Sequence, residues 1–96
     1  MIVKIDPDIE DLVEFFLVKR REDYVNLVKL LKEENYNQIA QIGHRIAGTA
    51  LSYGFERIGE LARAMEMAAK AQKPADIRKV LIEYDKHLKE VKYECE

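Results

Sequence analysis

One histidine stands among unusually small neighbours in a segment that otherwise has helical periodicity. His44 follows Gly43 directly, and Gly48 comes four residues later, which is about one helical turn. A glycine inside a helix costs about 1 kcal/mol relative to alanine, so it usually indicates that something approaches the backbone closely. Neutral imidazole is a good nucleophile near pH 7. The spacing therefore indicates chemistry at the ring of His44.

Helical periodicity predicts that His44 points to solvent. With a rotation of about 100° per residue, Ile39 and Ile46 lie on one buried stripe, and His44 lies well away from it. The face around the histidine is made of small or polar residues: Ala40, Gln41 and Gly48. Gly43 lies at the edge of the buried stripe, so we expect it to serve helix packing. We expect Gly48 to clear the approach to His44.

The elements that would position this face are helices. Apolar residues recur at helical spacing over five ranges: 7–18, 20–33, 37–52, 55–71 and 75–92. Pro7 and Pro74 suit first helical positions, and Gly54 suits a helix end. Short connections favour antiparallel neighbours. The sequence therefore predicts an all-α fold, an antiparallel up-down four-helix bundle with an additional short N-terminal helix, and no strand.

The composition excludes several classes of protein. The 96 residues, 48% of them hydrophobic, predict one small folded domain over 1–96, and the net charge of −2 argues against nucleic-acid binding. No signal peptide and no apolar stretch of about 18 residues is visible, so we expect a cytoplasmic protein without a membrane segment. The single Cys95 excludes an intrachain disulfide or a cysteine zinc site. No residues at metal-ligand spacing surround His44.

The segment 44–55 resembles the histidine-containing phosphotransfer (HPt) domain. That family has a histidine, a hydrophobic residue, usually a lysine, then glycine and small residues, and a second glycine followed by an aromatic or other residue. The matching positions here are His44, Ile46, Gly48, Thr49, Ala50, Gly54 and Phe55. The acidic start of the chain, the run Arg20-Arg21-Glu22-Asp23 and the helix containing Leu61, Met65 and Glu66 look like small stand-alone bacterial members. The resemblance therefore covers nearly the whole chain.

This resemblance implies a histidine phosphocarrier of a two-component phosphorelay. His44 would accept a phosphoryl group from the aspartyl phosphate of a receiver domain, or from a kinase, and pass it to another receiver. Arg45, Gly48 and Gln41 would support the phosphoryl group or the partner. The chain would need no cofactor, because Mg²⁺ would come from the receiver, and it would have no autonomous kinase activity. We expect a monomer whose partners are response-regulator receivers or a hybrid histidine kinase.

The chain departs from the family at Ala47, where lysine is usual. That cation would neutralise phosphate charge, and Arg45 could replace it only from the opposite flank of the helix. The partner would dock on Ala40, Ala47 and Leu51. A basic cluster, Lys19, Arg20 and Arg21, is either a solvated helix face or a surface that steers an acidic receiver.

Other readings of the same residues remain open. Because Ala47 replaces the usual lysine, the chain could instead be a non-phosphorylated helical module that binds and sequesters a receiver or kinase. A purely structural bundle or oligomerisation domain is a third class. His87 lies at the edge of an apolar stripe without a neighbouring glycine, and we expect no function for it.

Overall fold

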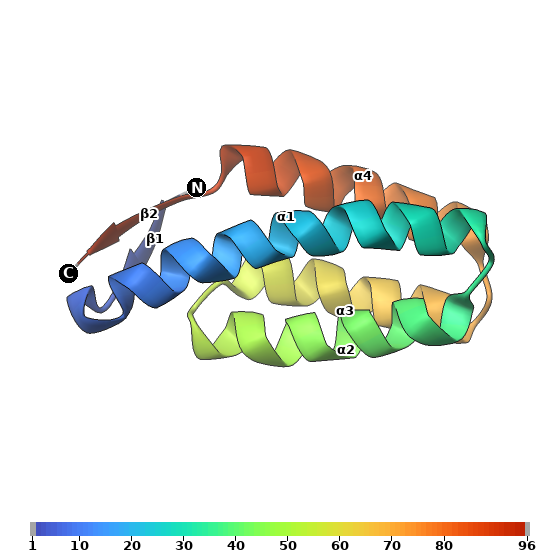
Figure 1. Ribbon diagram of the computed structural model, residues 1–96, viewed down its shortest axis with the longest axis horizontal. Coiled ribbons are helices and arrows are strands. Elements are labelled where there is room, and N and C mark those ends of the chain that lie inside the picture. Colours follow the sequence, from blue (N-terminus) through green and yellow to red (C-terminus); the bar gives the residue numbers. More distant parts are fainter. Residues whose placement is uncertain (1, 96) are drawn as a thin grey trace.

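Four helices make up most of the protein. The computed structural model describes residues 2–95, and its helices are α1 (Glu10–Lys32), α2 (Tyr36–Ser52), α3 (Glu56–Lys70) and α4 (Pro74–Glu90). In Figure 1 the helices lie side by side, with α1 and α4 drawn above α2 and α3, and each short turn brings the next helix back alongside. The predicted helical bundle of four helices is confirmed.

The two predicted N-terminal helices, 7–18 and 20–33, are one continuous helix from Glu10 to Lys32. The prediction of an additional N-terminal helix is therefore wrong. From residue 2 onward, the one helical segment before α1 is a short 3₁₀-helix, Pro7–Ile9. The apparent break arose because Arg20 occupies a buried position between Phe16 and Leu27 on the stripe that faces the core. Its guanidinium lies over the ring of Phe16, 4.7 Å from the centroid. A charged residue therefore interrupts the apolar pattern without interrupting the helix.

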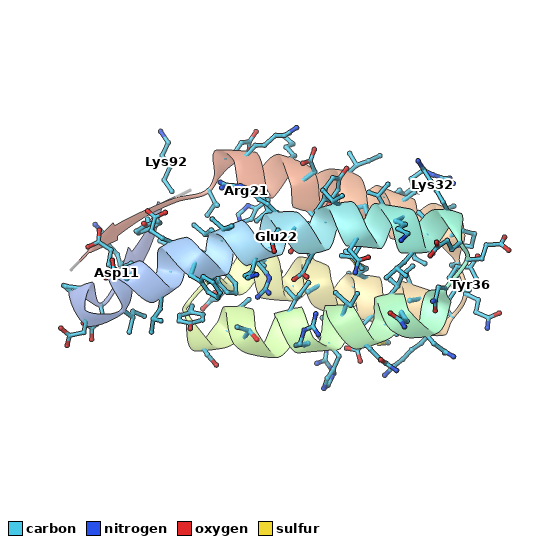
Figure 2. All side chains as sticks on the ribbon, viewed as in Figure 1. Asp11, Arg21, Glu22, Lys32, Tyr36 and Lys92 are labelled. Atoms are coloured by element: carbon cyan, nitrogen blue, oxygen red, sulfur yellow. The ribbon has the colours of Figure 1, made fainter. Side chains whose placement is uncertain are left out.

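Two short strands join the ends of the described chain, although the sequence predicted none. Strand β1 (Ile2–Ile5) pairs in parallel with β2 (Lys92–Cys95), and Val3 lies opposite Tyr93. The last helix consequently ends at Glu90, two residues before the predicted 92. Four-residue strands are too short to show an alternating pattern, and their pairing is remote in sequence. Figure 2 shows Asp11 and Lys92 near this end, and Lys32 and Tyr36 at the other.

Three helices end in the same way, with one residue in the left-handed region. These residues are Glu34, Gly54 and Gln72, with φ of 55°, 83° and 53°. After each of them the chain returns a hydrogen bond to the helix, as Phe55 N–H does to the carbonyl of Ala50 at 2.9 Å. This arrangement satisfies carbonyls that the helix end leaves free. Gly54 thus ends α2, as the sequence predicted.

The core runs along the bundle axis and receives side chains from every helix. Its largest fully buried side chains are Tyr84, Phe55, Leu27, Ile39, Ile46, Ile58, Met65, Ile77 and Val13. The hydroxyl of Tyr84 donates to the carbonyl oxygen of Arg20 at 3.3 Å, and burial raises its pKa. Ile39 and Ile46 fix which face of α2 is buried. They thereby fix the face on which His44 is exposed.

Candidate functional site

His44 projects from the middle of α2 into solvent. Its side chain is 77% exposed, whereas Ile46, two residues later, is fully buried. The exposure that helical periodicity predicts is therefore confirmed. The backbone on either side of the histidine is regular helix.

A carboxylate from the neighbouring helix holds one nitrogen of this ring. Oε2 of Glu66, on α3, lies 3.1 Å from Nδ1 of His44. The same oxygen lies 3.0 Å from Nζ of Lys70, one turn further along α3. The hydrogen bond from Lys70 holds the pKa of the Glu66 carboxyl below its ordinary value of 4.5, against the effect of burial, and His44 lowers it further. Glu66 is therefore ionised at neutral pH.

An ionised Glu66 determines which nitrogen of His44 carries the proton. A carboxylate only accepts hydrogen bonds, so Nδ1 must be the donor. In the neutral ring, Nε2 is then the unprotonated nitrogen and holds the free lone pair. The arrangement leaves the nucleophilic nitrogen of His44 on an exposed ring, oriented from behind by a carboxylate that is itself buried.

Gly43 makes this contact between helices possible. A Cβ at Gly43 would lie 2.8 Å from the carbonyl oxygen of Ala62 and 3.1 Å from the backbone nitrogen of Glu66. Only a residue without a side chain lets α2 and α3 approach so closely. The packing role predicted for Gly43 is confirmed, and the packing brings the backbone of Glu66 next to the residue before His44.

Gly48 has no such packing role. A Cβ at this position would meet no atom within 4 Å. The glycine is exposed and lines a hollow of about 410 Å³ between α2 and α3. This hollow is bordered by His44, Ala47, Gly48, Leu51, Glu56, Gly59, Glu60 and Arg63. The helix thus tolerates the cost of a glycine at Gly48 without any packing need for it inside the chain.

A second hollow lies on the other side of His44. It measures about 360 Å³ and is lined by Ala40, Gln41, His44, Glu66 and Lys70. Ala40 and Ala47, which the sequence placed on a docking surface, are only 9% and 8% exposed. They line the two hollows but expose little surface of their own. Leu51 differs, because it is 63% exposed.

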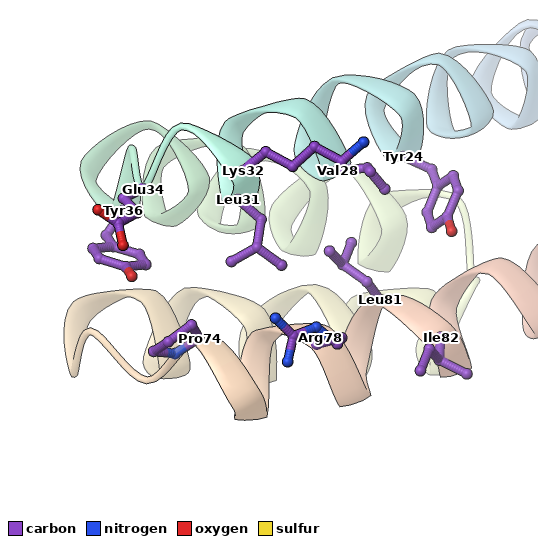
Figure 3. Close-up of a pocket in the computed structure, with 10 residues that line it drawn as sticks. All are labelled: Tyr24, Val28, Leu31, Lys32, Glu34, Tyr36, Pro74, Arg78, Leu81 and Ile82. Atoms are coloured by element: carbon purple, nitrogen blue, oxygen red, sulfur yellow. The ribbon is translucent and has the colours of Figure 1, made fainter.

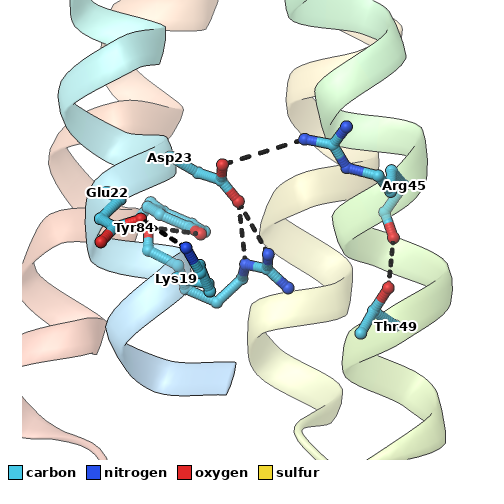
Figure 4. A network of polar contacts seen from close by, with 7 residues as sticks. Lys19, Glu22, Asp23, Arg45, Thr49 and Tyr84 are labelled. Carbon is cyan, nitrogen blue, oxygen red and sulfur yellow. Dashed lines mark hydrogen bonds and ion pairs between the residues drawn. The ribbon is translucent and has the colours of Figure 1, made fainter. Parts of the chain in front are cut away.

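Arg45 turns away from the two hollows, toward α1. Its guanidinium lies 3.9 Å from a carboxylate oxygen of Asp23, and Figure 4 shows the two side chains reaching toward each other. The carbonyl of Arg45 accepts a hydrogen bond from Thr49 Oγ1 at 2.9 Å. Arg45, from α2 itself, and Lys70, from α3, therefore lie on different sides of the histidine.

The predicted basic cluster on α1 does not form one exposed surface. Arg20 is 9% exposed, and its guanidinium binds Asp23 at 2.9 Å. Lys19 is paired with Glu22 at 3.2 Å. Arg21 is exposed, and Figure 2 shows it on the side of α1 toward α4. Arg20 therefore belongs to the buried packing of α1, which fits neither a solvated helix face nor a surface that steers a receiver.

His87 lies apart from this site, beside Phe55 and Arg57, in a hollow that also contains Val3. Its side chain is partly buried, and burial together with the Arg57 guanidinium lowers its pKa. Glu56 borders both this hollow and the one beside His44, but the two histidines do not line the same hollow.

Sequence reasoning missed Glu66 and Lys70 as site residues. Glu66 is a charged residue on the buried stripe of α3, between Ala62 and Ala69. Such a carboxylate needs a partner when it is buried, and Lys70 follows it by one turn. The sequence therefore contains a signal for the pairing of Glu66 with Lys70. It contains none for the pairing of Glu66 with His44, because that contact depends on the register between α2 and α3.

Within residues 2–95, no three histidine, cysteine, aspartate or glutamate side chains are grouped so that they could hold a metal ion. In the same part of the chain, no helix is long and apolar enough to cross a membrane. Neither the curated proteins nor the solved structures give a match. The Hpt domain family matches residues 11–94, and the chain therefore belongs to this family of phosphotransfer modules in phosphorelay signalling.

Proposed function

We propose that the protein is a histidine phosphocarrier in which Nε2 of His44 accepts a phosphoryl group from a receiver domain and passes it to another receiver. Hpt domains work with receiver domains and kinases in phosphorelays. The observation that carries the proposal is the hydrogen bond between Glu66 and Nδ1 of His44. It leaves Nε2 free on a ring that is 77% exposed.

The transfer step needs one nucleophile from this chain. The lone pair of Nε2 attacks the phosphorus of an aspartyl phosphate, and the N–P bond forms as the P–O bond breaks. The aspartate leaves as a carboxylate with the electron pair. The ring of His44 keeps its Nδ1 proton and so becomes positively charged, which the carboxylate of Glu66 balances. The reverse step, onto a second receiver, returns the neutral ring.

Lys70 supplies the charge that Ala47 lacks. Phosphoryl transfer depends mainly on alignment and on stabilising charge. The family's usual lysine would stand at Ala47 on α2, whereas here Nζ of Lys70 lies 3.0 Å from the Glu66 oxygen that also binds His44. The long side chain of Lys70 is 64% exposed and can turn from Glu66 to a phosphoryl oxygen. Gln41 lines the same hollow and can donate a further hydrogen bond.

The receiver would dock over the two hollows that meet at His44. Gly48 leaves room for the receiver's phosphorylated aspartate, and the exposed Leu51 offers an apolar contact beside it. Arg45 would face an acidic rim of the receiver. The Mg²⁺ ion that such a transfer requires would come with the receiver, and the carrier would act as a monomer in the cytoplasm.

Phosphotransfer between purified proteins tests the proposal. The protein is incubated with each phosphorylated receiver of its source organism, and its phosphate is tested for lability in acid and stability in base. We expect rapid labelling of the wild type and none of His44→Gln. Equal labelling of the two proteins would refute the carrier role of His44.

The same experiment separates a second candidate function. No cation stands on α2 beside the ring except Arg45, which is turned toward Asp23; this favours a module that binds a receiver without being phosphorylated. Such a module would bind receivers equally well as wild type and as His44→Ala, and no phosphohistidine would form. Rapid phosphoryl exchange excludes it.

A further inference from the structure

A groove between α1 and α4 lies away from the residues around His44. It has a volume of about 560 Å³ and is lined from both helices and from the turn that leads into α2 (Figure 3). Its floor is apolar and includes Val28 and Leu31 of α1 and Leu81 of α4. Grooves of this size between helices are common binding sites.

Two cations stand on opposite sides of this groove. Lys32 belongs to α1 and Arg78 to α4, and both line the groove and are exposed. Within residues 2–95, neither side chain has a hydrogen-bond or ion-pair partner. Glu34, beside Tyr36 at the far end in Figure 3, is the one carboxylate among the lining residues. The groove therefore combines an apolar lining with two cations and one carboxylate, which leaves it with a net positive charge.

Exposed aliphatic side chains extend the apolar surface beyond the groove. Ile82 lines it and is still 62% exposed, and Val25 is 68% exposed. Val25 precedes Val28 by about one helical turn and Lys32 by two, so the three lie on one face of α1. Contiguous exposed apolar surface of this kind marks interaction sites when it is large, and here it continues the apolar lining of the groove along α1 and α4.

We propose that this groove binds an amphipathic helix of a partner protein, with acidic side chains facing Lys32 and Arg78. From Val25 to Lys32, α1 rises by about 10 Å, which matches the spacing of apolar anchors at i, i+3 or i+4, and i+7 on a bound helix. Such a helix covers Val25 and Ile82 and pairs with the two free cations.

Other occupants fit the surface less well. A small anionic amphiphile would fill the groove but leave Val25 and Ile82 exposed. A second copy of this chain would bring identical surfaces together around a twofold axis, so that Lys32 and Arg78 would face a groove of the same charge. A helix from a partner avoids both difficulties.

Apart from Tyr36, the first residue of α2, the groove and the histidine site use different helices. His44 and its partner Glu66 belong to α2 and α3, whereas the groove lies between α1 and α4. A helix bound in the groove therefore leaves His44 free, and the protein can be held by one partner while it exchanges a phosphoryl group with another. The proposal does not depend on that exchange, because the groove needs only apolar burial and charge.

Binding of a synthetic helix tests the proposal with the full chain. The probe is a peptide of about 15 residues with leucines at helical spacing and glutamates beside them; a matched peptide has lysines in place of the glutamates. Binding is followed by backbone amide NMR shifts in the wild type, in Lys32→Glu/Arg78→Glu, and in Lys79→Glu. Lys79 is exposed on α4 and does not line the groove, so its variant tests whether reversing a charge outside the groove has the same effect. Folding of each variant is checked by circular dichroism.

We expect the glutamate peptide to bind saturably and to shift amides around Val28, Arg78 and Ile82. The double variant should weaken binding by about fivefold or more, and Lys79→Glu should change it little. Phosphotransfer to His44 should be unaffected in the double variant. Equal binding of both peptides, shifts outside the groove, or no saturable binding would overturn the proposal. Decanoate serves as a small anionic amphiphile, and groove shifts that it reproduces alone would assign the groove to such an anion and overturn the proposal. Groove shifts that depend on protein concentration would assign it to a second copy of the chain, with the same consequence.

Discussion

Glu66 reaches from α3 to the ring of His44 on α2, and its Oε2 accepts a hydrogen bond from Nδ1 at 3.1 Å. The two residues are 22 positions apart in the chain, so the contact depends on how two helices pack. The packing in turn depends on Gly43, whose missing side chain lets the backbones of α2 and α3 approach. The protonation pattern of an exposed histidine is thus set by a buried helix contact.

Removing the carboxylate should change the tautomer of His44. In the wild type we expect the neutral ring to carry its proton on Nδ1, and in Glu66→Ala we expect the Nε2–H form to gain population. Phosphotransfer should slow by about 10- to 100-fold, the size of effect seen when the hydrogen-bond partners that orient metal-ligating histidines are removed. Ring nitrogen shifts in long-range ¹H–¹⁵N NMR spectra measure the tautomer directly.

Glu66→Gln is the matched control for this prediction. The amide oxygen can still accept from Nδ1, so the tautomer should be retained and the loss of rate should be smaller than in Glu66→Ala. If Glu66→Ala leaves both the tautomer and the rate unchanged, Glu66 does not orient His44.

Lys70 and position 47 should be interchangeable as sources of positive charge. Lys70→Ala should slow phosphotransfer by up to about tenfold, because an exposed charge contributes about 1 kcal/mol. Adding Ala47→Lys to that variant restores a cation beside the ring and should recover most of the rate. Single-turnover transfer rates of wild type, both single variants and the double variant measure this. A double variant no faster than Lys70→Ala would show that Lys70 acts in another way.

The two glycines beside His44 should respond to alanine in opposite directions. Gly48→Ala should stabilise the protein by about 0.5–1 kcal/mol, since its Cβ meets open space. Gly43→Ala should destabilise it by about 1–3 kcal/mol, since its Cβ would lie 2.8 Å from the carbonyl oxygen of Ala62. Chemical denaturation gives both free energies of unfolding.

A larger residue at Gly48 separates folding from transfer. Gly48→Gln should fold as well as the wild type while transferring phosphate more slowly, because its side chain crowds the approach to His44. Normal transfer in this variant would mean that Gly48 clears no path for a partner.

The lowered pKa of Glu66 predicts a specific dependence of stability on pH. A carboxyl whose pKa is lower in the folded than in the unfolded state stabilises the fold above the unfolded value, here about 4.5, and this contribution disappears as pH falls through the folded value. The stability difference between wild type and Glu66→Gln should therefore be constant from pH 7 to about pH 5 and shrink below pH 4.5. Denaturation in a His44→Gln background removes the histidine's own titration. A difference that is independent of pH would contradict the assignment.

The helices of the bundle follow from local patterns in the sequence, but the continuity of α1 does not. Apolar spacing gives the exposed face of α2, and Gly54 gives its end, because both depend on neighbours within a few residues. The split of α1 failed at Arg20, where a long side chain buries its stem while its charge is paired with Asp23. A pattern of apolar and polar residues does not recognise such a residue as part of the core.

The residues of the candidate site also fall into those that a local pattern predicts and those that depend on helix packing. His44 and Gly48 stand out within one helix, so the sequence is sufficient to select them. Glu66 and Lys70 come from α3, and their distance to His44 depends on the register of two helices in contact. The pairing of Val3 with Tyr93 in the strands is missed for the same reason, since the partners lie at opposite ends of the chain.

The position of the phosphoryl group on the protein tests the central claim most directly. After reaction with a phosphorylated receiver, long-range ¹H–¹⁵N and ³¹P NMR spectra identify the nitrogen bonded to phosphorus. The account predicts a single phosphohistidine at Nε2 of His44, with the proton retained on Nδ1 toward Glu66. A phosphoryl group on Nδ1 of His44, or on His87, would contradict it.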